Sequence, residues 1–327
     1  MNRIESIDTV KGIAMLCVII LHTAINYPGN LYVGSCIHAF VTPFFMPVFF
    51  MITGMFFSTR LPFIDFIKKK FRRLVIPFIS FYILTYLINL ILFKFNISTK
   101  NGFRYSDIFQ VFHQDVFSNN VIWFLLALFW SSIFLYLILK YIKSVFYQSL
   151  IILFLYMLGI LLDKYHINIM LYVDTSLSVM PFLYIGYILK YYDLLNKISI
   201  LSKYKLLFYG FLTGGGNFLF QQSISLVNNS CGNPLYFIIG STLGCFFIII
   251  FCFMIKKIFL LSYIGYNSMI VLCTHMFVIN FFVKAINIFN ITNLSIKITV
   301  VVFLVCVSMY LIVPFLRRYV PFLIGEK

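Results

Sequence analysis

The sequence predicts an all-α, polytopic integral membrane protein, a bundle of about ten transmembrane helices. Of its 327 residues, 62% are hydrophobic and only 10% are charged. A soluble domain of this size does not need so much apolar surface, whereas stretches of about twenty apolar residues match the thickness of a bilayer. Ten such stretches lie at about 7–26, 35–58, 74–95, 120–139, 145–162, 174–192, 205–227, 235–255, 262–283 and 296–316. We expect one membrane-embedded domain over 1–327, with no soluble domain appended.

The basic residues predict how these spans are oriented. Nineteen of the 25 lysines and arginines fall on one side of a ten-span arrangement. The other six are Lys94, Lys100, Arg104, Lys164, Lys284 and Lys297. Such an excess marks the cytoplasmic side, so both termini are expected in the cytoplasm. The net charge of +16 therefore indicates topology rather than nucleic-acid binding. The lipid bilayer is the expected partner, and a multi-pass location in the cell (inner or plasma) membrane is expected.

The first span, from Ile7 to about Asn26, carries Asp8, Lys11 and His22 among apolar residues. Each ionisable group at the centre of a membrane helix costs roughly 2.5–3.5 kcal/mol, so such groups indicate function. Lys11 and His22 are eleven residues apart, which is about 20° beyond three full turns and about 16 Å along the axis. One face of this helix therefore carries a cation near the cytoplasm and an imidazole in the outer half.

Three histidines are expected at comparable depth in the outer half of the membrane. His22 belongs to the first span, His38 to the second and His275 to the ninth. An alternative for His38 is an interfacial group whose ring lies at the membrane boundary. Three imidazoles can hold zinc, but no carboxylate accompanies these to orient them. We therefore expect no metal site and no bound cofactor.

Five segments, in chain order, resemble the motifs of acyltransferase family 3, the integral membrane acyl-CoA-dependent O-acyltransferases of polysaccharides. They are R-x-x-x-x-D-x-x-K-G-(x)9-H (Arg3, Asp8, Lys11, Gly12, His22), PFFMPVFFMITGMFF in the second span, RRLVIPF (Arg73, Leu74, Pro77), IWFLLALF (Trp123, Phe124, Leu125, Leu128) and YIGYNSMIVLCTH (Gly265, Asn267, Ser268, His275). Each match alone is weak, but the ordered set from residue 3 to residue 275 is fairly specific. Two positions depart from the family. Phe45 stands where many members have histidine, and Leu272 or Cys273 stands where a tyrosine is usual.

The resemblance implies an O-acetyltransferase that moves an acyl group, usually acetyl, from cytoplasmic acyl-CoA to a hydroxyl of a cell-envelope or exported polysaccharide. Acetyl-CoA would be a donor substrate, and a glycan or lipid-linked sugar the acceptor. A sugar hydroxyl is a poor nucleophile, and neutral histidine suits the role of base. His22 is the candidate, either as base or as the carrier of the acyl group in two steps. His275 is the second catalytic candidate.

Several residues are assigned to donor or acceptor binding, each beside a structural alternative. Lys11, next to Asp8, either meets the donor's phosphates or extends to the cytoplasmic interface. The run KKKFRR, Lys68 to Arg73, is either a topology anchor or a phosphate clamp in which Arg73 is the best candidate. Trp123 fits an aromatic belt or a sugar-stacking platform. Asn267 and Ser268 belong to the late motif, and Ser268 shares a helix face with His275. His38 completes this set.

Two other functions fit the same features. A transporter or flippase for a lipid-linked glycan would use the intramembrane charges to line its path. A transporter of small ions would use His22 in a proton relay. Both alternatives predict substrate movement without consumption of acyl-CoA.

Overall fold

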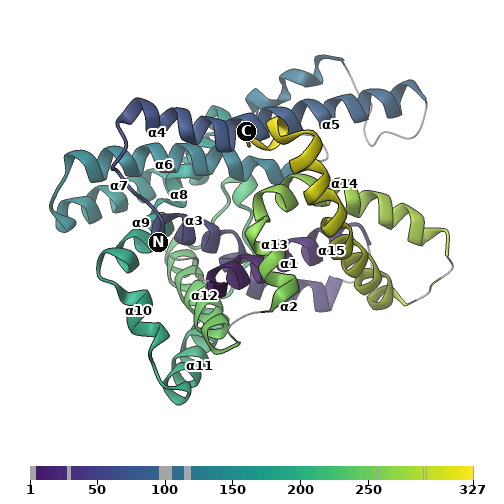
Figure 1. Ribbon diagram of the computed structural model, residues 1–327. Coiled ribbons are helices and arrows are strands. Elements are labelled where there is room, and N and C mark those ends of the chain that lie inside the picture. Colours follow the sequence, from purple (N-terminus) through teal and green to yellow (C-terminus); the bar gives the residue numbers. More distant parts are fainter. Residues whose placement is uncertain are drawn as a thin grey trace. The chain divides into compact units, whose positions relative to one another are not determined.

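The computed structural model describes residues 5–27, 31–95, 105–113, 119–255, 258–289, 291 and 293–326. Within these ranges the regular elements are helices, and the β-type pairing is one isolated bridge between Ser225 and Ser230. The predicted all-α, multi-pass class is therefore confirmed. Figure 1 shows the helices in sequence colours.

Eight helices in the described ranges are long and apolar enough to cross a membrane. A ninth candidate is a bent pair, Met170–Ser178 and Met180–Tyr191, interrupted at Val179. The predicted seventh span, 205–227, is shorter than expected, because α11 ends at Leu219 after 17 residues. Polar residues Gln221, Gln222 and Ser223 follow it. Seventeen residues is the lower end of the length that spans a bilayer, so the count of ten stays a prediction.

The described helices group into two compact units. Unit 1 comprises Met1–Phe57, Val179–Ser225 and Ser230–Val313, and unit 2 comprises Ser58–Ser178, Leu226–Asn229 and Pro314–Lys327. The helices of unit 1 are α1 (Glu5–Ile25), α2 (Leu31–Phe45), α3 (Pro47–Met55), α9 (Met180–Tyr191), α10 (Leu194–Ser199), α11 (Lys203–Leu219), α12 (Pro234–Ile255), α13 (Phe259–Tyr266), α14 (Ser268–Asn287) and α15 (Leu294–Tyr319) as far as Val313.

Glycines let pairs of helices in unit 1 pack with their backbones in contact. A Cβ on Gly12 of α1 would overlap the carbonyl oxygen of Leu261, and a Cβ on Gly265 of α13 would overlap that of Asp8. Gly54 of α3 and Gly186 of α9 form a second reciprocal pair of this kind. Small residues permit such close approach, which is a common way for membrane helices to associate. The contact of α1 with α13 (Figure 1) therefore depends on two glycines.

Unit 2 contains the remaining helices. They are α4 (Phe63–Lys70), the π-helix η1 (Phe71–Val75), α5 (Ile76–Lys94), η2 (Tyr105–His113), η3 (Asn120–Ile122), α6 (Trp123–Tyr141), α7 (Val145–Lys164), η4 (Met170–Tyr172), α8 (Val173–Ser178), η5 (Leu226–Asn228) and η6 (Pro321–Ile324). Lys70 Nζ donates to Ser132 Oγ at 3.1 Å, which joins the end of α4 to α6. Tyr136 of α6 donates to the carbonyl of Leu61 at 2.7 Å.

The basic run KKKFRR was expected in the connection before the third span, but it is helical. The chain runs through α4, η1 and α5 without a loop, and Lys68, Lys69 and Arg73 are exposed along it. Proline at position 77 explains the π-helix, because proline has no N–H and its ring clashes with the carbonyl four residues earlier, that of Arg73. A π-helix closes each hydrogen bond over one more residue than an α-helix, and this widening relieves the clash.

Candidate active site

The two histidines proposed for catalysis lie next to each other in unit 1. His22 is near the end of α1 and is partly exposed, whereas His275, at the start of the third turn of α14, is completely buried. Their ring centroids are 5.6 Å apart, and the ring planes are inclined by 53°. Two imidazoles from opposite ends of the sequence thus form one pair, hereafter the histidine pair.

The hydrogen bonds of His275 fix which of its ring nitrogens carries the proton. Its Nδ1 lies 2.9 Å from the carbonyl oxygens of both Val271 and Leu272. A carbonyl oxygen only accepts hydrogen bonds, so Nδ1 must donate, and a neutral ring then has its lone pair on Nε2. This Nε2 is buried and has no hydrogen-bond partner among the described residues. His275 therefore presents an unused acceptor on the edge of its ring away from Nδ1.

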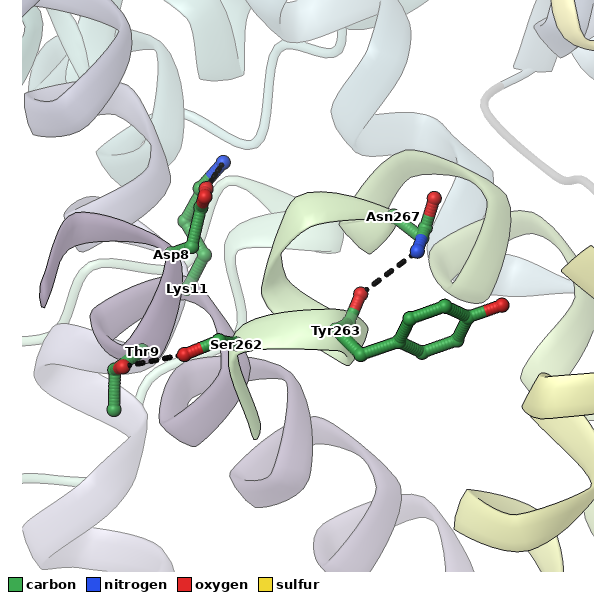
Figure 2. Close-up of polar contacts among 6 residues, drawn as sticks. All are labelled: Asp8, Thr9, Lys11, Ser262, Tyr263 and Asn267. Atoms are coloured by element: carbon green, nitrogen blue, oxygen red, sulfur yellow. Dashed lines mark hydrogen bonds and ion pairs between the residues drawn. The ribbon is translucent and has the colours of Figure 1, made fainter. Parts of the chain in front are cut away.

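The other end of α1 carries Asp8 and Lys11, which form an ion pair. Lys11 Nζ is 2.8 Å from Asp8 Oδ1, with the two side chains 21% and 8% exposed. Both point to the same side of the helix, while Thr9 points away and shares a 2.8 Å hydrogen bond with Ser262 of α13 (Figure 2). Because α1 is continuous from residue 5 to 25, Lys11 and His22 share one face of it, as the sequence predicted. The charge of Lys11 is balanced by Asp8.

The predicted ninth span is interrupted at Asn267, between α13 and α14. Asn267 Nδ2 donates to the carbonyl of Tyr263 at 2.8 Å (Figure 2), and its buried Oδ1 has no hydrogen-bond partner among the described residues. Ser268 is the first residue of α14 and is partly exposed. It is two turns from His275 on the same helix, so the two lie on one face.

His38 contacts a different part of unit 1. Its Nδ1 is 3.1 Å from the hydroxyl of Ser223, in the segment that follows α11. Phe45, where many family members have histidine, is the last residue of α2, directly before the helix break at Met46.

Arg73 and Trp123 belong to unit 2. Arg73 is exposed on the π-helix η1. Trp123 begins α6 and is buried, with its ring 6.2 Å from that of Tyr172. A belt residue would expose its ring at the membrane boundary, so Trp123 does not fit the belt alternative. Its role toward a sugar stays a prediction.

Sequence reasoning gave no role to the residues that hold α1 against α13. Gly12 and Gly265 permit the backbone contact, and Thr9 and Ser262 add a buried hydrogen bond. The sequence did contain one sign of this contact. In each helix a small hydroxyl residue is followed three positions later by a glycine, Thr9 by Gly12 and Ser262 by Gly265, so that two small residues lie on one helix face. That pattern is short and common, so it does not identify the partner helix.

No group of three histidine, cysteine, aspartate or glutamate side chains in the described ranges could hold a metal ion. The sequence expectation of no metal site stays a prediction.

The model of the acyltransferase domain of acyltransferase family 3 matches residues 4–317. No curated protein and no solved structure matches the chain. The family match covers the segments that carry both histidines, Asp8, Lys11 and the late Asn267–Ser268 motif. The chain therefore belongs to acyltransferase family 3, and it is a multi-pass membrane acyltransferase.

Proposed function

We propose that this acyltransferase moves an acetyl group from cytoplasmic acetyl-CoA to a hydroxyl of a cell-envelope or exported polysaccharide, in the cell (inner or plasma) membrane. The observation that carries the proposal is the histidine pair, in which one ring is partly exposed and the other offers a buried acceptor. Acyl transfer to a hydroxyl needs a base that can accept a proton and return it, and neutral imidazole is suited to both steps.

In the direct route, His22 removes the proton of the acceptor hydroxyl as its oxygen attacks the thioester carbonyl. A carbon–oxygen bond forms, and the tetrahedral intermediate then breaks its carbon–sulfur bond. The departing thiolate of CoA takes the proton back from His22, so the ring ends neutral. The partial exposure of His22 supports this role, because the base must reach a substrate atom.

His275 assists the step through its free acceptor. When His22 gains a proton, its ring carries two N–H donors, and Nε2 of His275 can accept one of them. Such a bond to a charged donor stabilises the protonated ring more than the neutral ring. His275 itself is held in the required tautomer by the carbonyls of Val271 and Leu272.

The two-step route uses the same residues. His22 would attack the thioester itself, release CoA and carry the acetyl group until the acceptor hydroxyl attacks. Here an acetylated His22 accumulates when donor is supplied without acceptor, whereas the direct route leaves the protein unmodified. Rapid quenching followed by mass spectrometry of the peptide from α1 distinguishes the two routes.

The proposal is tested with purified protein, radiolabelled acetyl-CoA and glycan prepared from a strain that lacks the gene. We expect label to enter the glycan as a base-labile ester, together with release of one CoA thiol per acetyl group. A transporter or flippase would move substrate without consuming acetyl-CoA. Absence of both ester formation and thiol release would overturn the proposal.

A further inference from the structure

Unit 2 contains two pairs of arginines that are far apart in the sequence. Arg72 and Arg73 lie on η1, whereas Arg317 and Arg318 lie in the last turn of α15. Residues 320–326, hereafter the post-α15 turn, follow the second pair in the chain and pack on the helix that carries the first pair. Gly325 in this turn packs so closely on η1 that a Cβ there would overlap the carbonyl oxygen of Arg72 and lie 3.4 Å from the Cα of Arg73.

The conformation of the post-α15 turn is well defined. Gly325 has φ +68°, in the left-handed region that favours glycine. Ile324 is buried, Gly325 N donates to the carbonyl of Phe322 at 3.1 Å, and Glu326 N donates to that of Pro321 at 3.0 Å. These contacts hold the residue that follows the glycine, Glu326, where its carboxylate pairs with Arg317.

Glu326 places a carboxylate beside Arg317. Its Oε2 is 3.3 Å from Nε of Arg317, and the two side chains are 42% and 35% exposed. An ion pair that is this exposed contributes at most about 1 kcal/mol, so a stronger anion can replace the carboxylate. A phosphate group is such an anion, because guanidinium groups bind phosphate oxygens through two parallel hydrogen bonds.

We propose that the two arginine pairs form one binding site for a phosphate ester, and that Glu326 occupies this site until the phosphate ester displaces it. Resting on the proposed function, the ligand is the phosphate-bearing end of acetyl-CoA. The expected topology supports this, since Arg73 and Arg317 were both assigned to the cytoplasmic side from charge. Glu326 thus competes with the donor and sets its apparent affinity.

The test measures the apparent KM for acetyl-CoA and the dissociation constant of CoA in neutral detergent. Glu326→Gln removes the competing charge, and we expect both constants to fall about two- to fivefold, the range of an exposed ion pair. Arg317→Ala removes a phosphate ligand, and we expect both to rise about tenfold, with kcat unchanged. In the Arg317→Ala background, Glu326→Gln should have no further effect, because its partner is absent.

Asp65→Asn is the matched control. Asp65 is an exposed carboxylate in the first turn of α4, so this variant changes the net charge of the same unit equally without touching the Arg317 pair. Its constants should stay within about twofold of wild type. Equal effects of Asp65→Asn and Glu326→Gln would overturn the proposal, as would constants that do not change in Arg317→Ala.

A lipid headgroup offers the same phosphate chemistry, so the measurements are repeated with phosphatidylglycerol added. If Glu326→Gln increases retention of phosphatidylglycerol but leaves CoA affinity unchanged, the site takes lipid and the donor assignment is wrong. If wild-type protein neither binds CoA nor transfers acetyl, the proposed function fails. If it does both while the variants behave as wild type, only the present inference fails.

Discussion

The two ends of α1 differ in how their polar groups are used. At the first end, Asp8 pairs with Lys11, Thr9 with Ser262, and Gly12 brings the helix into backbone contact with α13. At the second end, His22 lies beside His275, whose buried Nε2 has no hydrogen-bond partner among the described residues. Burying an unsatisfied acceptor costs about 1–3 kcal/mol. The N-terminal end of α1, hereafter the anchoring end, therefore holds the helix against α13. The C-terminal end, hereafter the reactive end, keeps a hydrogen-bond acceptor available for catalysis, and this lowers the stability of the protein.

The largest loss of acetyl-transfer rate is expected from His22→Ala. Loss of a general base lowers the rate about 10²–10⁴-fold, and loss of a covalent acceptor lowers it further. The protein should still insert, because alanine makes the helix more apolar. The measurement is radiolabelled acetyl transfer at matched protein abundance.

His166→Asn is the control for the preceding variant. His166 lies in an exposed loop with φ 54°, a conformation that asparagine tolerates. Its activity should equal that of wild type. Transfer by His22→Ala within a few-fold of wild type would remove His22 from catalysis.

His275→Ala should have a smaller effect on rate than His22→Ala. A hydrogen bond to a charged group contributes about 1.5–3 kcal/mol, which corresponds to roughly a 10- to 100-fold loss of kcat. Because His275 assists only the protonated state of His22, the apparent KM for acetyl-CoA should change little. A change confined to KM would instead make His275 a binding residue.

Gly265→Ala tests whether the contact of α13 with the N-terminal end of α1 positions the histidine pair at the C-terminal end. The added methyl group overlaps the backbone of Asp8, and such overpacking costs about 1–3 kcal/mol. We expect a lower melting temperature together with slower acetyl transfer, since α13 leads directly into α14. Gly215→Ala in α11 is the control, because a Cβ there meets nothing within 4 Å. Equal behaviour of the two variants would show that the close contact has no special importance.

Lys11→Ala should have the smallest effect on kcat, because a residue that only holds the donor's phosphates changes the apparent KM. The substitution leaves the buried Asp8 carboxylate without its lysine, which costs more than the roughly 1 kcal/mol of an exposed pair and up to about 3 kcal/mol. The double variant with Asp8→Asn should recover the melting temperature. If Lys11 also binds the donor's phosphates, the apparent KM for acetyl-CoA stays raised in the double variant. Recovery of both quantities would restrict Lys11 to a structural role.

Sequence reasoning predicted the reactive end of α1 better than the anchoring end. An ionisable residue inside an apolar span is unusual, so His22 and Lys11 were evident, and helical spacing placed them on one face. The partner of a glycine contact is not encoded nearby, and Gly12 meets a residue about 250 positions later. For His22 and His275, the sequence predicted only that they lie at a similar depth in the membrane. It did not predict that they contact each other, because a sequence gives the position of a residue along its helix but not which helix packs beside it.

Local departures from regular structure were also missed. The π-helix at Phe71–Val75 changes only which hydrogen bonds are made, and the apolar pattern through it is unaltered. The break at Asn267 falls inside a stretch that reads as one apolar span. Trp123 is buried, and its ring lies 6.2 Å from that of Tyr172, a contact between residues about fifty positions apart that composition cannot indicate.

The break at Asn267 has a mechanical consequence for the histidine pair. His275 lies eight residues beyond it, so α14 acts as a lever arm of about 12 Å between this joint and the imidazole. A tilt of about 10° at the joint would displace the ring by about 2 Å, and misplacements of about 1 Å can cost a hundredfold in rate. The hydrogen bond from Asn267 to Tyr263 braces that joint. The stiffness of the break at Asn267 therefore controls how well the two imidazoles align, although Asn267 itself need not contact either substrate.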